Sequence, residues 1–374
     1  MIEEKKKLWK RVNFKTVVMI HIVMILLWSV LSFIRPLCDW YADSILYRVL
    51  SDTLMRVTSL VSFSMGEVLI ALGIIALIVG LLSLILTPFL KSKKNFRRFL
   101  AGYGKCILMT ILVILNIYGF LYLLPFRSST IVSNGNATKK YTEEDLIKVN
   151  NYLVEQANEL SKKVARDKDG NILLTTDCEK DLHQSMKKLS GQYPRLSGFY
   201  GPVKSLKSSA LLDWMNIGGV TFPFTKEAVR NAYINDLYFP TLASHELCHN
   251  KGYYKENEAE FLSFLACTSS DNDYIKYSGY IYASCDVMME LDKNGDLGNA
   301  ECLNEQVHLD LAYAQCIAEE RYENEVNDTL EDIVSEPAEQ ASEVGWDTQA
   351  KILNENNYDG VIRLLLGYYD GILY

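Results

Sequence analysis

Three long apolar stretches before Pro125 constrain the fold of this chain more than any other feature. They cover residues 16–34, 68–90 and 106–124. About 20 apolar residues, at 1.5 Å of helix rise each, cross the hydrocarbon core of a bilayer. Soluble domains rarely contain three such stretches, so we expect three transmembrane helices. The first is longer than the apolar region of a signal peptide, and no small-residue cleavage site follows it, which indicates a retained span.

The positions of Lys and Arg predict the orientation of these spans. Residues 1–15 and residues 91–105 carry six basic side chains each, whereas the longer stretch 35–67 carries three. Short cytoplasmic loops are enriched in Lys and Arg. We therefore expect a cytoplasmic N-terminus (1–15), a membrane segment (16–124) and an extracytoplasmic remainder. This describes a multi-pass protein of the cell membrane, with the lipid bilayer as a partner.

The remainder of the chain differs in composition from the membrane segment. Its 250 residues carry 23 basic and 40 acidic side chains, a formal net charge of -17. Nucleic acid is excluded as a partner, because binding a polyanion requires a basic surface. A polar stretch predicts a linker over residues 125–140, and residues 141–374 are long enough for one extracytoplasmic domain. Six cysteines lie in this part, and their pairing does not follow from the sequence.

Residues 218–225 predict one strand in a part of the chain that is otherwise mostly helical in pattern. The stretch combines β-branched and aromatic residues with Pro223, which removes one donor from a sheet ladder. A strand here should therefore lie at a sheet edge. An edge can accept an extended peptide by strand addition, so we expect a substrate-binding edge strand. Its residues are Val220, Thr221, Phe222 and Phe224.

The motif His245-Glu246-Leu247-Cys248-His249 is the most specific chemical signal in the sequence. On a helix, positions i and i+4 share one face, so both imidazoles can reach one ion, and Glu246 can reach a water on it. Zinc suits this set of donors. With five His in 374 residues, such a pattern arises by chance roughly 0.01 times per chain. We expect one Zn²⁺ ion, with a third protein ligand further along the chain.

The motif resembles that of the zincin metallopeptidases, and Glu256-Asn-Glu-Ala-Glu260 is similar to the stretch that supplies the third ligand in their gluzincin branch. The resemblance implies that His245, His249 and Glu256 bind zinc and that Glu246 is the general base. Glu260, which stands where the gluzincin pattern has Asp, would orient a ligand histidine. The short spacing after His249 leaves Glu258 as a rival third ligand.

A second resemblance covers most of the chain. The three N-terminal spans, the stretch Gly219-Val-Thr-Phe-Pro-Phe-Thr-Lys-Glu227 and the metal motif resemble the bacterial family called domain of unknown function 3810. That family implies a membrane-anchored metallopeptidase and supplies no substrate. The expected architecture is three N-terminal transmembrane helices followed by an α+β, mostly helical zincin-like metallopeptidase domain with a small sheet.

The predicted function is zinc-dependent hydrolysis of peptide bonds in a peptide or protein substrate, with Glu246 as general base. The alternative is a non-catalytic membrane receptor or scaffold with a structural zinc site. An intact Glu246 favours the enzyme, because a structural site does not need a base. The sequence leaves the stabiliser of the oxyanion open, and the candidates are Tyr253, Tyr254, His308, Tyr358 and Arg363.

Overall fold

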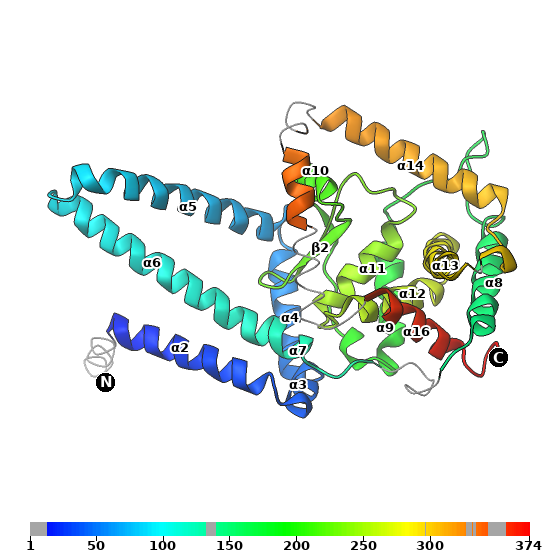
Figure 1. Cartoon of the computed structure of the whole chain (residues 1–374), viewed down its shortest axis with the longest axis horizontal. Coiled ribbons are helices and arrows are strands. Elements are labelled where there is room, and N and C mark those ends of the chain that lie inside the picture. Colours follow the sequence, from blue (N-terminus) through cyan, green and yellow to red (C-terminus); the bar gives the residue numbers. More distant parts are fainter. Residues whose placement is uncertain (1–12, 132–139, 296, 327–330, 332–333, 343–356) are drawn as a thin grey trace. The chain divides into compact units, whose positions relative to one another are not determined.

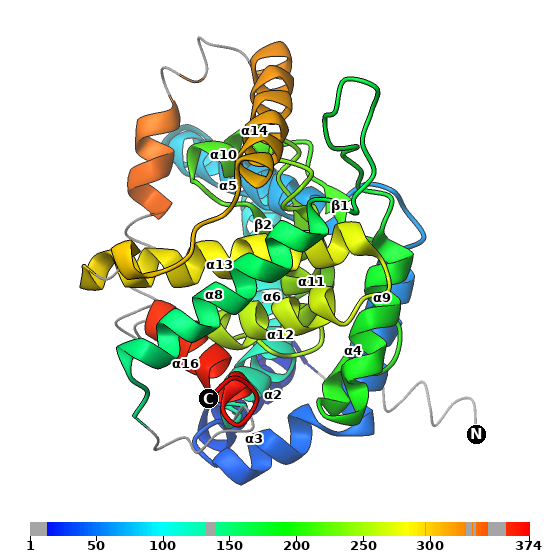
Figure 2. The ribbon, with the colours of Figure 1, turned by 90° about the vertical axis from the view of Figure 1, so that its right-hand side faces the viewer.

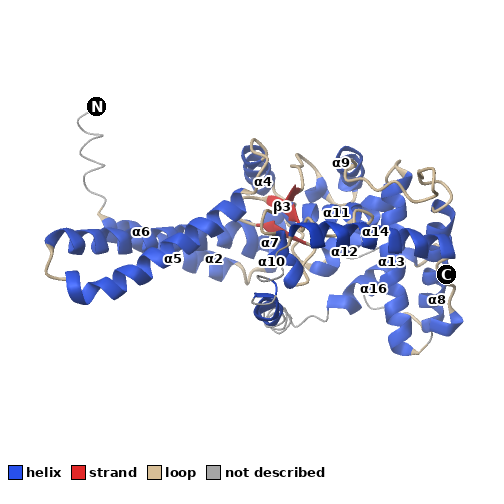
Figure 3. Cartoon of the chain, turned by 90° about the horizontal axis from the view of Figure 1, so that it is seen from above, coloured by secondary structure: helices blue, strands red, loops and turns tan. Residues whose placement is uncertain are grey.

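The structure, a computed structural model, describes residues 13–131, 140–295, 297–326, 331, 334–342 and 357–374. The described chain is mostly helical, with one sheet of three strands (Figures 1 and 3). It divides into two units, the first made of residues 13–47, 65–129 and 223–225 and the second of residues 48–64, 130–222 and 226–374 within the described ranges. Of the predicted N-terminal segment 1–15, residues 1–12 lie outside the described residues.

The first unit contains three helices that are long and apolar enough to cross a membrane, as the sequence predicted. They are α2 (Phe14–Leu31), α5 (Met65–Leu90) and the continuous stretch of α6 (Lys94–Tyr118), η1 (Gly119–Leu123) and α7 (Leu124–Phe126). A further short helix, α3 (Arg35–Ala42), follows α2. Most apolar side chains of α2 and α5 are exposed in the protein, which is the pattern expected of helices covered by lipid.

The third long helix differs from its prediction at both ends. It begins at Lys94, so part of the predicted basic loop 91–105 is helical. Lys and Arg are good helix formers, and continuing a helix is less costly than starting one. The predicted linker 125–140 begins in α7, where Pro125 lies in the first turn. Residues 132–139 of this linker lie outside the described residues.

The second unit is built around three buried helices, α11 (Phe239–Asn250), α12 (Glu256–Thr268) and α13 (Asp273–Asn294), which pack against one another. Helix α8 (Glu143–Leu160) packs along α13, as Figure 2 shows, and α16 (Asn357–Tyr369) packs on α12. Further helices of this unit are α4 (Ile45–Thr58, of which 48–58 belong here), α9 (Glu179–Lys188), η2 (Leu189–Gly191), η3 (Pro194–Leu196), α10 (Ser209–Trp214), η4 (Leu297–Asn299) and α14 (Glu305–Glu325). Residues 334–342 are also helical.

The small sheet has the strand order β1-β3-β2, with β1 (Lys204–Ser205), β2 (Gly219–Phe222) and β3 (Glu227–Arg230). β1 pairs with β3 in parallel, and β2 pairs with β3 antiparallel, with Val220 opposite Val229. β2 is therefore an edge strand, as predicted. Phe224, which the sequence placed in this strand, lies instead in the turn that joins β2 to β3, since the ladder ends at the pair Phe222 and Glu227.

The second unit is larger than the domain 141–374 that the sequence predicted. Residues 48–64, which the sequence assigned to the membrane segment, belong to it. This segment consists mainly of α4 and lies between the first and second long apolar helices along the chain. Its membership could not be read from local patterns, because it depends on contacts with residues about 150 to 200 positions away.

Candidate metal centre

Helix α11 presents both motif histidines on one side. Pro240 lies in its first turn, where its missing N–H is no loss. Every residue of α11 except His245 is buried, so the helix is fixed by packing on all sides. It ends at Asn250, and Gly252, two residues later, has a φ of 91°, in the left-handed region. This reversal turns the chain so that α12 can pack against α11.

The first residue of α12 completes a cluster of three ligand-type side chains. Glu256 Oε2 lies 3.1 Å from His245 Nε2 and 3.5 Å from His249 Nε2. Ligand atoms of His245, His249 and Glu256 all lie within 4.8 Å of one another. Tetrahedral zinc with bonds of about 2.0–2.1 Å holds its ligand atoms about 3.3 Å apart. The two measured distances therefore fit a zinc ion, and two imidazoles with one carboxylate leave a fourth position open.

Each histidine is oriented by a hydrogen bond at its other ring nitrogen. His245 Nδ1 lies 2.9 Å from Glu260 Oε2, and His249 Nδ1 lies 2.7 Å from the carbonyl oxygen of Tyr253. These contacts direct both Nε2 atoms toward the cluster, which is the arrangement found around metal-binding histidines. Burial disfavours a charged His245, but Glu256 and Glu260 outweigh it and raise its pKa well above the ordinary value.

Glu258, the rival ligand, has different partners. Its Oε1 accepts a hydrogen bond from Ile131 N at 3.1 Å and lies 3.5 Å from Lys255 Nζ. On a helix of about 100° per residue, positions 256 and 258 point about 200° apart, whereas 256 and 260 share a face. The structure therefore brings Glu256 and Glu260 to His245 and directs Glu258 elsewhere. The i, i+4 spacing indicates that Glu256 and Glu260 share a face and that Glu258 does not. Which of the two faces meets His245 depends on how α12 packs on α11.

Glu246 is held against the edge strand. Thr221 Oγ1 donates to Glu246 Oε2 at 2.9 Å and lies 2.7 Å from the Glu246 carbonyl oxygen. A Cβ at Gly219 would lie 3.0 Å from Glu246 Cγ and Oε1, so only glycine lets β2 approach this closely. Burial raises the pKa of Glu246, although the two histidines oppose it. The sequence predicts a substrate-binding role for Thr221 in the edge strand, and in the structure its side chain also contacts Glu246.

The candidates for an oxyanion stabiliser lie in different surroundings. His308 and Arg363 are exposed on α14 and α16, and the side chain of Tyr358 lies outside the described residues. Tyr253 contributes its carbonyl oxygen to His249, as described above. Tyr254 alone of the candidates stacks on a cluster residue, with its ring 6.1 Å from the His249 ring and nearly parallel to it.

Lys226 is a site residue whose role the sequence did not reveal. It is 1% exposed, has a φ of 54° and follows the turn after β2. Its Nζ donates to Tyr254 Oη at 2.6 Å and lies 3.3 Å from the Asn250 carbonyl oxygen. Burial lowers its pKa well below the ordinary value. Lys226 thus connects the turn of the sheet to the end of α11 and to the ring beside His249.

Helix α4 also contacts the end of α11, and the sequence did not predict this contact. Ser51 Oγ donates to the Asn250 carbonyl oxygen at 2.8 Å. Asp52 forms a 2.9 Å ion pair with Lys251, whose Nζ also donates to the Phe199 carbonyl oxygen at 2.6 Å. The backbone groups at the C-terminus of a helix lack partners within the helix. Ser51 supplies such a partner one residue after His249.

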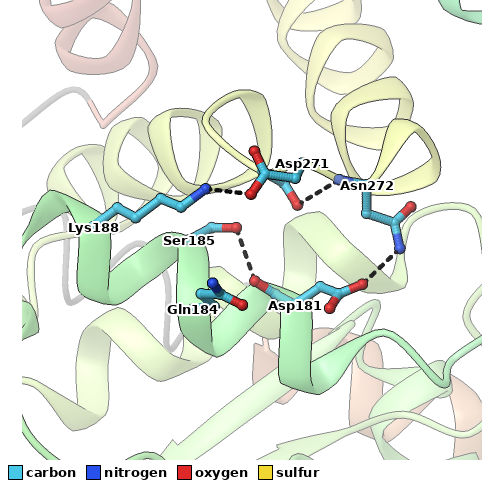
Figure 4. A pocket seen from close by; sticks show the side chains of 7 residues that line it. Asp181, Gln184, Ser185, Lys188, Asp271 and Asn272 are labelled. Atoms are coloured by element: carbon cyan, nitrogen blue, oxygen red, sulfur yellow. Dashed lines mark hydrogen bonds and ion pairs between the residues drawn. The ribbon is translucent and has the colours of Figure 1, made fainter.

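A polar hollow lies elsewhere in the second unit, between α9 and the segment that joins α12 to α13 (Figure 4). Lys188 pairs with Asp271 at 2.6 Å, and Asn272 Nδ2 donates to Asp181 at 3.0 Å. These side chains bind one another across the hollow. No cluster residue lines it, so it is separate from the candidate metal centre.

Comparison with known proteins identifies a family but no characterised relative. The family model described as Protein of unknown function (DUF3810) matches residues 41–365. No curated protein and no solved structure matches the chain. The matched range begins in α3 and ends in α16, so it includes α4, the sheet and all residues of the candidate metal centre. The chain therefore belongs to the DUF3810 family.

Proposed function

We propose that this protein is a membrane-anchored, zinc-dependent peptidase that cleaves peptide bonds outside the cytoplasm. One observation carries the proposal. His245, His249 and Glu256 have ligand atoms within 4.8 Å of one another, and a buried Glu246 lies on the same helix beside the first of them. A structural zinc site does not require this glutamate. The same arrangement supports a zincin-like domain of the gluzincin type.

A bound zinc ion would supply the Lewis acid that acidifies water and polarises a peptide carbonyl. Glu246 then accepts the proton of the attacking water and later donates it to the leaving amine. Thr221 orients the Glu246 carboxylate through its 2.9 Å hydrogen bond. Glu260 and the Tyr253 carbonyl hold the two imidazoles in place. The hydrophobic packing around α11 keeps these groups in fixed positions.

Strand β2 supports binding of an extended peptide. It pairs with β3 on one side, and no other described strand pairs with its outer edge. A peptide could add there by backbone hydrogen bonds. Since Thr221 lies within this strand and contacts Glu246, a peptide on β2 would lie beside the proposed base. Val220 and Phe222 are the neighbouring residues of the strand.

The chain segments that form the second unit support the proposed orientation of the membrane spans. Within the described residues, 48–64, 130–222 and 226–374 share one unit, and two of the three long apolar helices lie between residues 64 and 130 in the sequence. Two crossings return the chain to its starting side, so this unit can form with both parts on one face of the membrane. Three spans then put the N-terminus on the opposite face, which agrees with the basic residues at 1–15 and 91–105.

The test compares the native full-length protein with Glu246→Gln. The full chain is required because α4 belongs to the second unit. Zinc stoichiometry and hydrolysis of an unbiased peptide library are measured for both. We expect one zinc in each protein and cleavage by the native protein alone, because Gln keeps an acceptor for Thr221 and removes the base. One zinc without cleavage in either would favour the receptor or scaffold, and a protein that binds no zinc would refute the site.

A further inference from the structure

Helix α4 has two faces of different character. Its buried face consists of Ser51, Met55 and Thr58, at helical spacing, and it packs within the second unit. The opposite face and the turn that follows expose large apolar side chains beside the polar side chains of Thr53 and Arg56. The apolar side chains are Val49 (54% exposed), Val57 (58%), Leu60 (83%) and Phe63 (46%). An apolar helix face of this kind marks an interaction surface.

The position of α4 in the sequence identifies what covers this apolar face. The helix lies between α2, which ends at Leu31, and α5, which begins at Met65, and both are long and apolar enough to cross a membrane. A helix between two spans is held near the bilayer at both ends. Amphipathic helices in this situation lie in the headgroup layer with their apolar side chains toward the lipid.

We propose that α4 lies in the headgroup layer and holds the metal centre at the membrane surface, so that the substrate is a membrane-anchored polypeptide cut in the segment next to the bilayer. This inference rests on the peptidase function proposed above. It adds the substrate class, which neither the motif nor the family supplies.

The contacts of α4 set the distance between lipid and site. Ser51 and Asp52 bind Asn250 and Lys251, immediately after the ligand His249. A helix with its side chains is about 10–12 Å across. The apolar face of α4 is therefore about one helix diameter from the metal-binding end of α11.

The second connection from the membrane segment enters the unit beside the other ligand helix. Lys255 Nζ donates to Thr130 Oγ1 at 2.8 Å, and Ile131 N donates to Glu258 at 3.1 Å. Lys255 precedes Glu256 in the sequence and Glu258 follows it, so the two contacts flank this residue. Thr130 follows the last residue of α7, Phe126, by four positions. Both segments that lead from the long apolar helices thus join the unit at its ligand-bearing helices.

This placement limits which peptide bonds of a membrane-anchored substrate the site can reach. A site about 10–20 Å from the lipid, with an extended chain spanning about 3.5 Å per residue, reaches roughly the first six residues outside an anchor. A polypeptide held by a transmembrane helix or a lipid keeps its adjoining segment at that position at a high effective concentration, and this segment can lie extended along β2. A soluble protein reaches the site only by diffusion.

The first experiment tests the position of α4 in the full-length protein. Exposed Cys106, Cys302 and Cys316 are replaced by Ser, and a fluorophore is attached after Val57→Cys or, as a matched control, Leu309→Cys. The two parent side chains are 58% and 56% exposed. In phosphatidylethanolamine–phosphatidylglycerol liposomes with quencher-labelled lipid chains, we expect several-fold stronger quenching at position 57. Quenching at position 57 no stronger than at 309 overturns the inference.

The second experiment tests the substrate class with the zinc-loaded protein in the same liposomes. One randomised peptide pool is presented in three forms: free, fused directly to a transmembrane helix, and fused to the same helix through a 60-residue Gly-Ser spacer. The spacer keeps the anchor but moves the pool roughly 40 Å away from the membrane. We expect the directly fused pool to be cleaved at least tenfold faster than the other two. Equal cleavage of all three overturns the inference and leaves the peptidase intact. Cleavage of none refutes the peptidase function and the inference with it.

Discussion

The ion pair between Asp52 and Lys251 offers the sharpest test of whether α4 belongs to the unit that carries the candidate metal centre. The Lys251 side chain is 2% exposed and the Asp52 side chain 17%, with 2.9 Å between Nζ and Oδ1. Burial lowers the pKa of Lys251 to about 8, against the opposing effect of Asp52, so Lys251 is mostly charged at pH 7. Asp52→Asn keeps the shape of the side chain and removes its charge.

The expected cost follows from the surroundings of Lys251. Removing one partner of a buried pair costs about 3–5 kcal/mol. Lys251 would keep its 2.6 Å hydrogen bond to the Phe199 carbonyl oxygen and its position over the Tyr200 ring at 4.4 Å. We therefore expect a smaller loss of about 2–3 kcal/mol, which lowers the Tm of a domain of this size by roughly 4–12 °C. Thermal unfolding of the full-length protein at pH 7, followed by tryptophan fluorescence, measures it.

A matched control on an exposed ion pair separates the effect of burial from the effect of a short distance between the charges. Glu159 and Lys162 lie 2.6 Å apart on the surface, with side chains 55% and 64% exposed. Glu159→Gln should leave the Tm nearly unchanged, because exposed pairs contribute little. In the double variant Asp52→Asn with Lys251→Met, the losses should not add, since neither side chain is charged. Equal Tm values for Asp52→Asn and Glu159→Gln, or strict additivity, would refute the packing of α4 on α11.

Three further predictions concern the candidate metal centre and its surroundings. In a chelator competition, Glu256→Gln should lower zinc affinity more than about 100-fold, and Glu258→Gln should leave it nearly unchanged. A larger loss of affinity in Glu258→Gln than in Glu256→Gln would identify Glu258 as the ligand. Glu260→Gln should lower zinc affinity by about 10- to 100-fold, because it weakens the orientation of His245, and unchanged affinity would contradict this role. Burial lowers the pKa of His183 from 6.5 to about 4. The neutral ring therefore contributes its full free energy of folding above pH 6.5. This contribution is lost as the pH falls toward 4. Between pH 7.5 and pH 5 the native protein should lose about 2 kcal/mol more stability than His183→Phe, in unfolding experiments at both pH values; equal losses would show that His183 is not buried as a neutral ring.

The position of the third ligand illustrates where sequence reasoning stops. Helical periodicity puts His245 and His249 on one face whatever the rest of the fold does, because positions i and i+4 always share a side. Whether Glu256 or Glu258 joins them depends on how α12 packs on α11. That packing follows from the reversal at Gly252 and from the contacts of Glu258 with Ile131 and Lys255. Long-range contacts of this kind have no signature in a local pattern.

Features that depend on neighbouring residues could be predicted from the sequence. Apolar length predicted the three long helices, proline placement predicted the edge strand, and residue spacing predicted the paired histidines. The meeting of distant groups appears only in the folded chain, where Thr221 contacts Glu246, Lys226 contacts Tyr254 and residues 48–64 join the unit with the candidate metal centre. Periodicity along a chain sets the faces of its elements, whereas burial and hydrogen bonding between residues far apart in the sequence set how those faces pack.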